Sequence, residues 1–159
     1  MDGDLQSLAV FTMQMLDELE AVVAVRFVEQ VADFALTTRC FLKEAQSAWL
    51  LAQSGANLDE ALGLARTANE KLPNTPSIID TIGWVYYKKG AYASAVDSFR
   101  ECVGKAPNNA ACQYHLGLSY SKIGDPRSAR VALEQGLKLN PAAPEATEAK
   151  TVLATLASR

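Results

Sequence analysis

Apolar residues recur at helical spacing along most of the chain. In the segment 76–89 they return every three or four residues, as on one face of an α-helix: Ile78, Ile79, Ile82, Val85 and Tyr86. Pro76 suits the first turn of such a helix, and Gly90 suits the left-handed residue that ends one. Similar helix-start residues, apolar stripes and helix-end residues occur throughout 42–143. The pattern predicts an all-α chain.

The apolar pattern repeats after 34 residues. Ile82-Gly83 returns as Leu116-Gly117, and the same separation joins five further pairs. These are Tyr86 and Tyr120, Gly90 and Gly124, Ala95 and Ala129, Phe99 and Leu133, and Pro107 and Pro141. Repeats of this length predict units of two helices joined by a turn, here 42–75, 76–109 and 110–143. The first unit is divergent because Trp49 stands at the position of Gly83 and Gly117.

Small residues predict where the two helices of a unit touch. Two helices approach closely only where one of them lacks bulk. We therefore expect Gly83 to face Ala95 and Gly117 to face Ala129. Leucine in place of Gly83 would overpack this contact at a cost of about 1–3 kcal/mol.

The two ends of the chain depart from the repeat. Residues 144–159 predict one more helix with a polar outer face, as on the capping helix of a repeat array. Residues 1–41 predict two helices, from about Asp4 to Glu20 and from the β-branched stretch 21–28 through Ala35. Together these would form a degenerate N-terminal hairpin. The alternative is that 1–41 is the incomplete beginning of a fragment from a longer array.

The repeated residues carry a family resemblance. Ile82-Gly83, Tyr86, Gly90 and their equivalents 34 residues later resemble the tetratricopeptide repeat, over about two thirds of the chain. The segment 81–90 also looks like the C-terminal repeats of bacterial members, some of which are linked to exopolysaccharide or protein export. The resemblance implies a right-handed superhelical solenoid of helix-turn-helix repeats. It also implies a concave groove that holds a peptide or protein segment, as in an adaptor or scaffold.

Equivalent positions of the first helices predict which side chains line this groove. The candidate groove residues are Leu50, Asp80, Trp84, Tyr87, Lys88, Tyr114, Leu118, Ser121 and Lys122. Aromatic side chains dominate binding hot spots, so Trp84, Tyr87 and Tyr114 are the expected anchors. Lys88 and Lys122 would favour an acidic ligand. The competing interpretation is that this stripe is core, or is covered by residues 1–41 or by another copy.

Members of the family that grip chaperone C-termini use a carboxylate clamp of Lys, Asn and Arg. The corresponding residues here are Gln46, Leu50, Trp84, Ala111 and His115, and none of them matches. We therefore expect no carboxylate clamp.

Composition and charge argue against several further classes of function. A net charge of -3 provides no basic surface for nucleic acid. The acidic start is unlike a signal peptide, and no stretch is long and charge-free enough for membrane insertion. His115 is interpreted as a packed or surface residue, and no phosphate loop, nucleophile turn or metal cluster is visible. The chain is predicted to be no enzyme and to need no cofactor or metal.

The three cysteines, Cys40, Cys102 and Cys112, have neither the spacing of a zinc site nor that of a disulfide framework. We interpret them as buried and reduced, which suits the cytoplasm. The periplasm is the alternative if the chain is a fragment of an exported protein. Two functions remain open: an adaptor that binds a protein segment, or a structural piece of a longer solenoid that self-associates through residues 1–41.

Overall fold

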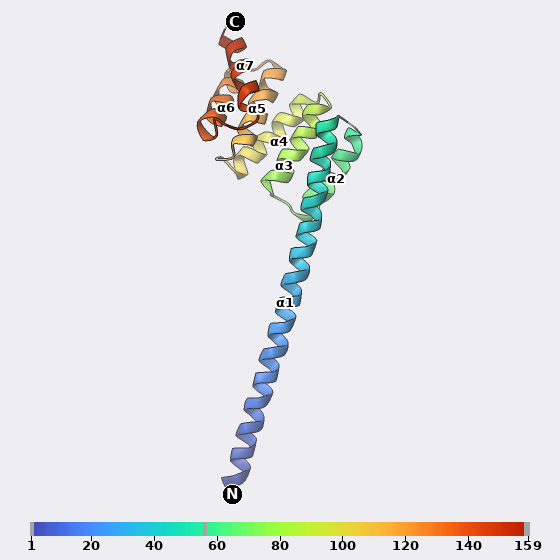
Figure 1. The fold of residues 1–159 in the computed structure, drawn as a ribbon, viewed down its shortest axis with the longest axis vertical. Coiled ribbons are helices and arrows are strands. Elements are labelled where there is room, and N and C mark those ends of the chain that lie inside the picture. The colour runs from blue at the N-terminus through green and yellow to red at the C-terminus, as the bar shows by residue number, and fades with distance from the viewer. Residues whose placement is uncertain (1, 56, 158–159) are drawn as a thin grey trace. The chain divides into compact units, whose positions relative to one another are not determined.

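The computed structural model describes residues 2–55 and 57–157, and side chains at 23, 26, 27, 29–55 and 57–157. All regular structure in these ranges is helical (Figure 1). The helices are α1 (Asp2–Ser54), α2 (Leu58–Lys71), α3 (Pro76–Lys88), α4 (Tyr92–Lys105), α5 (Ala110–Ile123), α6 (Pro126–Leu139) and α7 (Ala146–Ala157). The chain divides into two units, residues 1–40 and 41–159, and α1 contributes to both. Each unit is described by itself.

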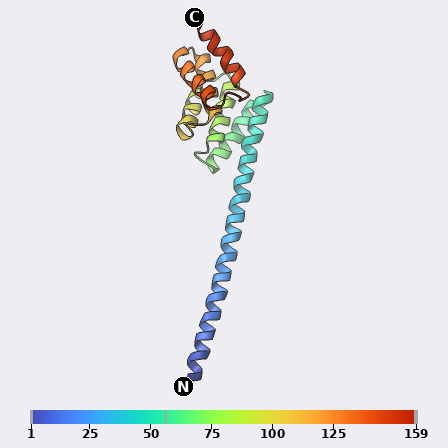
Figure 2. The same ribbon diagram turned by 60° about the vertical axis from the view of Figure 1, so that its left-hand side comes forward.

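The unit 41–159 is an all-α helical-repeat solenoid. Each helix from α2 to α7 packs on the next, α3 also touches α5, and α5 touches α7. Figure 1 and Figure 2 show these helices stacked in chain order. Helix starts recur every 34 residues, at Leu58, Tyr92 and Pro126 in one series and at Pro76 and Ala110 in the other. The helical hairpin is therefore the repeating element.

Local chemistry explains where these helices begin and end. The side chain of Asn57 accepts a hydrogen bond from the backbone N–H of Glu60 and donates one to its carboxylate, which caps α2. The side chains of Asn109 and Asp125 cap α5 and α6 by accepting hydrogen bonds from backbone N–H groups of the first turn. Gly124 ends α5 at a φ of 81°, where glycine carries no steric penalty.

Close contacts between paired helices form at two glycines. A Cβ on Gly83 would lie 2.6 Å from the Phe99 ring, and one on Gly117 would lie 2.6 Å from Leu133. These nearest neighbours lie one helical turn beyond Ala95 and Ala129, the partners expected from the sequence. The glycines therefore make room for large side chains between the helices of the second and third hairpins.

The predicted hairpin in residues 1–41 is wrong. Residues 2–54 form one continuous helix, with no break near Glu20. The physical reason is that no glycine or proline occurs between Gly3 and Gly55. The β-branched stretch at 21–28 lowers helix propensity only slightly and does not end the helix. In the described residues, no helix is both long and apolar enough to serve as a membrane span.

The cysteines also differ from the prediction. Cys102 and Cys112 are buried and joined by a disulfide, which links α4 to α5. Cys40 is exposed on α1 and has a free thiol. The two residues lie on either side of the turn between two hairpins, and the folded turn brings their Cα atoms to 5.9 Å. The sequence spacing alone does not show this pairing.

Candidate functional site

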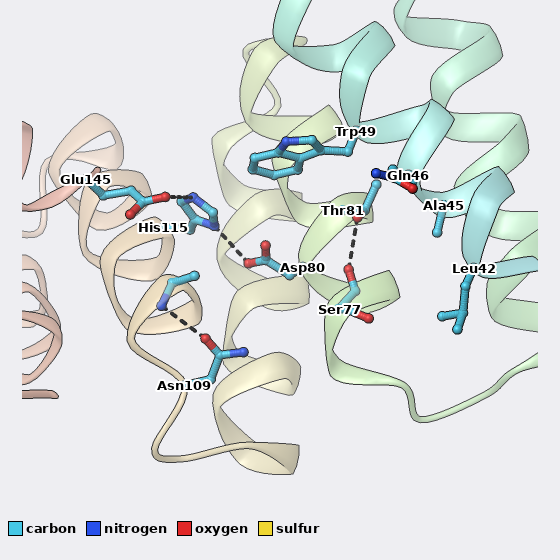
Figure 3. A pocket seen from close by; sticks show the side chains of 11 residues that line it. Leu42, Ala45, Gln46, Trp49, Ser77, Asp80, Thr81, Asn109, His115 and Glu145 are labelled. Atoms are coloured by element: carbon cyan, nitrogen blue, oxygen red, sulfur yellow. Dashed lines mark hydrogen bonds and ion pairs between the residues drawn. The ribbon is translucent and has the colours of Figure 1, made fainter. Parts of the chain in front are cut away.

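A cavity of about 360 Å³ opens between the first helices of the three hairpins (Figure 3). Its wall comes from the end of α1, from α3, from α5, and from the turn that precedes α7. The lining residues are Leu42, Ala45, Gln46, Trp49, Ser77, Asp80, Thr81, Asn109, Ala111, His115 and Glu145. All of them belong to the unit 41–159. The cavity is a candidate ligand site in the described part of the chain.

One wall of the cavity is built around His115, whose side chain is only 2% exposed. Its Nδ1 lies 2.8 Å from Oδ1 of Asp80, and its Nε2 lies 3.8 Å from Oε1 of Glu145. An ionised carboxylate only accepts hydrogen bonds, so Nδ1–H donates to Asp80. Its Nε2 has no hydrogen-bond partner among the described residues.

Aromatic rings hold this wall in place. The Trp84 ring lies 4.5 Å from the His115 ring and stacks on Trp49 and Tyr87 at 5.3 Å and 5.2 Å. Lys88 covers the Trp84 ring, with Nζ 4.9 Å from its centre. Such ring contacts restrict the movement of the rings but do not use the hydrogen-bonding atoms at their edges. The imidazole is therefore held by stacking and by one hydrogen bond.

Repeat geometry brings Asp80 and His115 together. They are 35 residues apart, which is one repeat plus one residue, and they face each other from neighbouring first helices. Close by, the Thr81 hydroxyl donates to the backbone carbonyl of Ser77 at 2.9 Å. The Asn109 side chain is occupied in capping α5. The carboxylates are thus the polar groups with spare capacity on this wall.

The candidate groove residues do not form a single surface. Asp80 lines the cavity, and Trp84 lies in the aromatic stack with 8% of its surface exposed. Tyr87 and Lys88 pack on Trp84, and Leu50 is exposed without lining the cavity.

Four further candidates lie elsewhere or in the core. Tyr114 and Leu118 are buried, which contradicts their assignment as peptide anchors. The Tyr114 ring packs against Gly136 of α6, and its hydroxyl donates to the carbonyl of Asn140. Leu118 packs in the same cluster as Ala146 and Ala149 of α7. The remaining candidates, Ser121 and Lys122, line a separate pocket against α7.

Of the residues that line the cavity, sequence reasoning proposed only Asp80 as a site residue, and it missed Trp49, His115 and Glu145 among the others. Trp49 was noted only as an exception to the repeat, and His115 was interpreted as a packed or surface residue. The usable signal was the 35-residue separation of His115 from Asp80, which places an acid and a histidine on adjacent helices. Glu145 carried no signal, because it lies outside the repeated units.

The phenols near the site are structural groups. Burial, and after it the charges of Glu148 and Tyr92, raise the pKa of Tyr87 to about 12. Burial, and then the charge of Glu145, raise the pKa of Tyr114 above its usual value. Both phenols are therefore neutral near pH 7 and do not act as bases there.

One group of metal-ligating atoms occurs in the described residues. It comprises a carboxylate oxygen of Asp80 and the sulfurs of Cys102 and Cys112, all within 4.8 Å of one another. The two sulfurs form the disulfide and are not thiolates, which are the form that binds metals.

Comparison with known protein families finds a match in the second half of the chain. Residues 86–156 match the tetratricopeptide repeat family. No curated protein sequence is a significant match to this chain.

Solved structures show the same fold. The first tetratricopeptide domain of Spaghetti (RPAP3), bound to the HSP90 peptide SRMEEVD, is 19% identical, with a TM-score of 0.66 over 76% of this chain and 95% of that one. The Sgt2 domain of Aspergillus fumigatus is 19% identical, with a TM-score of 0.65 over 77% and 78%. The Yersinia enterocolitica type III secretion chaperone SycD, in complex with a peptide of the translocator YopD, is 15% identical, with a TM-score of 0.66 over 76% and 94%. At these identities the likeness shows the fold.

Proposed function

We propose that this protein is a non-enzymatic interaction module of the tetratricopeptide repeat type that binds a segment of another protein in the cavity between α1, α3 and α5. The observation that carries the proposal is the cavity itself. It combines an apolar wall with polar groups that have spare hydrogen-bonding capacity, which is the usual make-up of a ligand site. Two of the similar domains hold a peptide, one from HSP90 and one from YopD, which supports the proposal.

The anchoring residues of this proposal differ from those expected from the sequence. Leu42 is exposed at the edge of the cavity, and Trp49 is half-buried beside it. They take the place of Tyr114 and Leu118, which the core already uses. A segment laid across α1 and α3 would cover Leu42 and the free edge of Trp49. Burial of such groups supplies most of the affinity at interfaces of this kind.

The test uses short peptides selected from a random display library on the full chain. Gln46 lines the cavity and Gln53 does not, although both are exposed on α1 within the same unit. Tryptophan at Gln46 should fill the entrance and weaken the selected peptides at least about tenfold. The matched variant Gln53→Trp should bind as the wild type does. If no peptide is selected, or if both variants bind like wild type in calorimetry, the proposal fails.

A second candidate function is self-association through the unit 1–40. Phe27, Val31 and Phe34 of α1 are all more than half exposed and follow the alternating four- and three-residue spacing of a coiled-coil seam. A second copy of the same helix is the partner that such a seam fits. Phe34→Glu should then abolish a dimer, whereas Ala32→Glu, off the seam, should keep it. Sedimentation that finds a monomer at every concentration rejects this candidate.

A further inference from the structure

We propose that the cavity selects its protein segment by a basic side chain, arginine above all, which enters beside Trp49 and meets the carboxylates of Asp80 and Glu145. This inference rests on the function proposed above and names the chemistry of the ligand. It departs from the acidic ligand that Lys88 and Lys122 suggested.

Two carboxylates bring acceptors to the polar wall of the cavity. Asp80 and Glu145 bring carboxylates whose side chains are 13% and 22% exposed. No lysine or arginine is among the residues that line the cavity. The nearest organised cation, Lys88, is already placed over the Trp84 ring. An ammonium or guanidinium group from a ligand would therefore meet negative charge with no competing cation.

The buried histidine fixes one of these carboxylates in place. His115 is almost fully enclosed, and its Nδ1 lies 2.8 Å from Oδ1 of Asp80. Its Nε2 lies 3.8 Å from Oε1 of Glu145, which is beyond hydrogen-bonding distance. The Asp80 carboxylate is therefore held against the ring, whereas the Glu145 carboxylate keeps its acceptor capacity for a donor from a ligand.

The opposite side of the cavity suits the rest of a long basic side chain. Leu42 and Ala45 offer apolar surface for a methylene stem, and Trp49 offers a ring face. Guanidinium groups stack on aromatic rings and present several donors in one plane. Arginine can therefore lie against the part of Trp49 that lines the cavity while its N–H groups reach the carboxylates. Lysine carries the same charge but has no planar group to place against the ring, so we expect it to bind less tightly.

An acidic or neutral segment fits this wall poorly. A carboxylate would face Asp80 and Glu145 at short range, where like charges repel. A purely apolar side chain would cover both carboxylates without satisfying them. Both effects disfavour such segments relative to one that carries a cation.

The experiment compares peptides and protein variants in one set of titrations. Peptides selected on the full chain are sequenced for enrichment of arginine or lysine. The tightest is then resynthesised with citrulline, which has the shape of arginine without its charge. We expect citrulline to weaken binding at least about tenfold, the usual scale of a charge-assisted contact.

Variants of the protein assign the effect to the wall. Glu145→Gln should weaken the arginine peptide about tenfold and leave the citrulline peptide nearly unchanged. Glu134→Gln, on the exposed surface of α6 and outside the cavity lining, should change neither. Glu145 lies in a turn and is not fully buried, so the variant should fold, which circular dichroism checks.

The outcomes separate this inference from the proposed function. If peptides bind and Gln46→Trp blocks them, but basic residues are not enriched and citrulline binds as tightly as arginine, the inference is overturned and the proposed function stands. If no peptide binds the cavity, both fail. Enrichment of acidic residues would overturn the inference directly.

Discussion

Gly117 is the position where a single methyl group should test the packing of the hairpins most sharply. A Cβ added there would lie 2.6 Å from Cγ of Leu133 and 3.0 Å from its backbone nitrogen. The neighbour is therefore partly backbone, so α6 itself must move away from α5. Gly63 is the matched control, since it is also inside a helix and its added Cβ would meet nothing within 4 Å.

The expected cost follows from these contacts. Both Gly117→Ala and Gly63→Ala gain about 1 kcal/mol from helix propensity, so this gain cancels in their difference. To restore ordinary contact, the two helices must separate by several tenths of an ångström or more. A gap of about 0.5–1 Å forfeits roughly a quarter to a half of each dispersion contact. For Leu133, which is fully buried, that loss and the accompanying strain amount to about 1–3 kcal/mol.

Urea unfolding of the two variants and the wild type, followed by circular dichroism, measures this difference. Gly63→Ala should be more stable than the wild type, and Gly117→Ala should be less stable than Gly63→Ala by about 1–3 kcal/mol. Equal stabilisation by the two substitutions would show that the hairpin has room at Gly117, and would refute the account of its packing.

Three further predictions follow from single contacts. Thiol titration of the unfolded, unreduced chain should detect only Cys40, and three reactive thiols would contradict the disulfide. Reduction of Cys102–Cys112 should lower the free energy of unfolding by about 2–3 kcal/mol. Asn109→Ala should cost about 1 kcal/mol in thermal unfolding, because it removes the cap of α5, and an unchanged melting temperature would contradict that role. Because the pKa of Tyr87 is raised to about 12 in the fold, wild-type stability should fall as the pH rises from about 10 to 12, and Tyr87→Phe should flatten this fall in unfolding titrations; parallel pH profiles would refute it.

Much of the fold could be predicted because the repeats contain residues that restrict the backbone conformation. Pro76, Gly90, Gly124 and Pro126 start or stop helices by their own conformational limits, whatever surrounds them. Residues 1–41 lack such residues after Gly3, and there the apolar pattern was divided into two helices that the structure joins. An apolar pattern shows which face of a helix is apolar, but it does not show where the helix ends.

The candidate site was harder to predict, because equivalent positions of a solenoid have different neighbours. Leu50, Trp84 and Leu118 occupy the same position in successive repeats, yet they are 62%, 8% and 2% exposed. Leu118 is covered by α7, and Trp84 by the rings of Trp49 and His115. The Gln46, Asp80 and Tyr114 row shows the same gradient from exposed to buried. Spacing predicts which side chains are equivalent, whereas exposure depends on what the next hairpin places over them.

This gradient also explains why the cavity lies where it does. Towards α7 each first helix is covered by the hairpin that follows, so its inward row becomes core. Nearer α1 the covering is incomplete, and Gln46, Trp49 and Asp80 keep part of their surface for a ligand. Because His115 and Glu145 come from the covered end and meet Asp80 there, the polar wall forms at the border between core and open surface. A partly desolvated charge at such a border interacts more strongly with a ligand than one in open water. The selectivity of the cavity is therefore expected to depend on these three residues more than on the exposed Leu50.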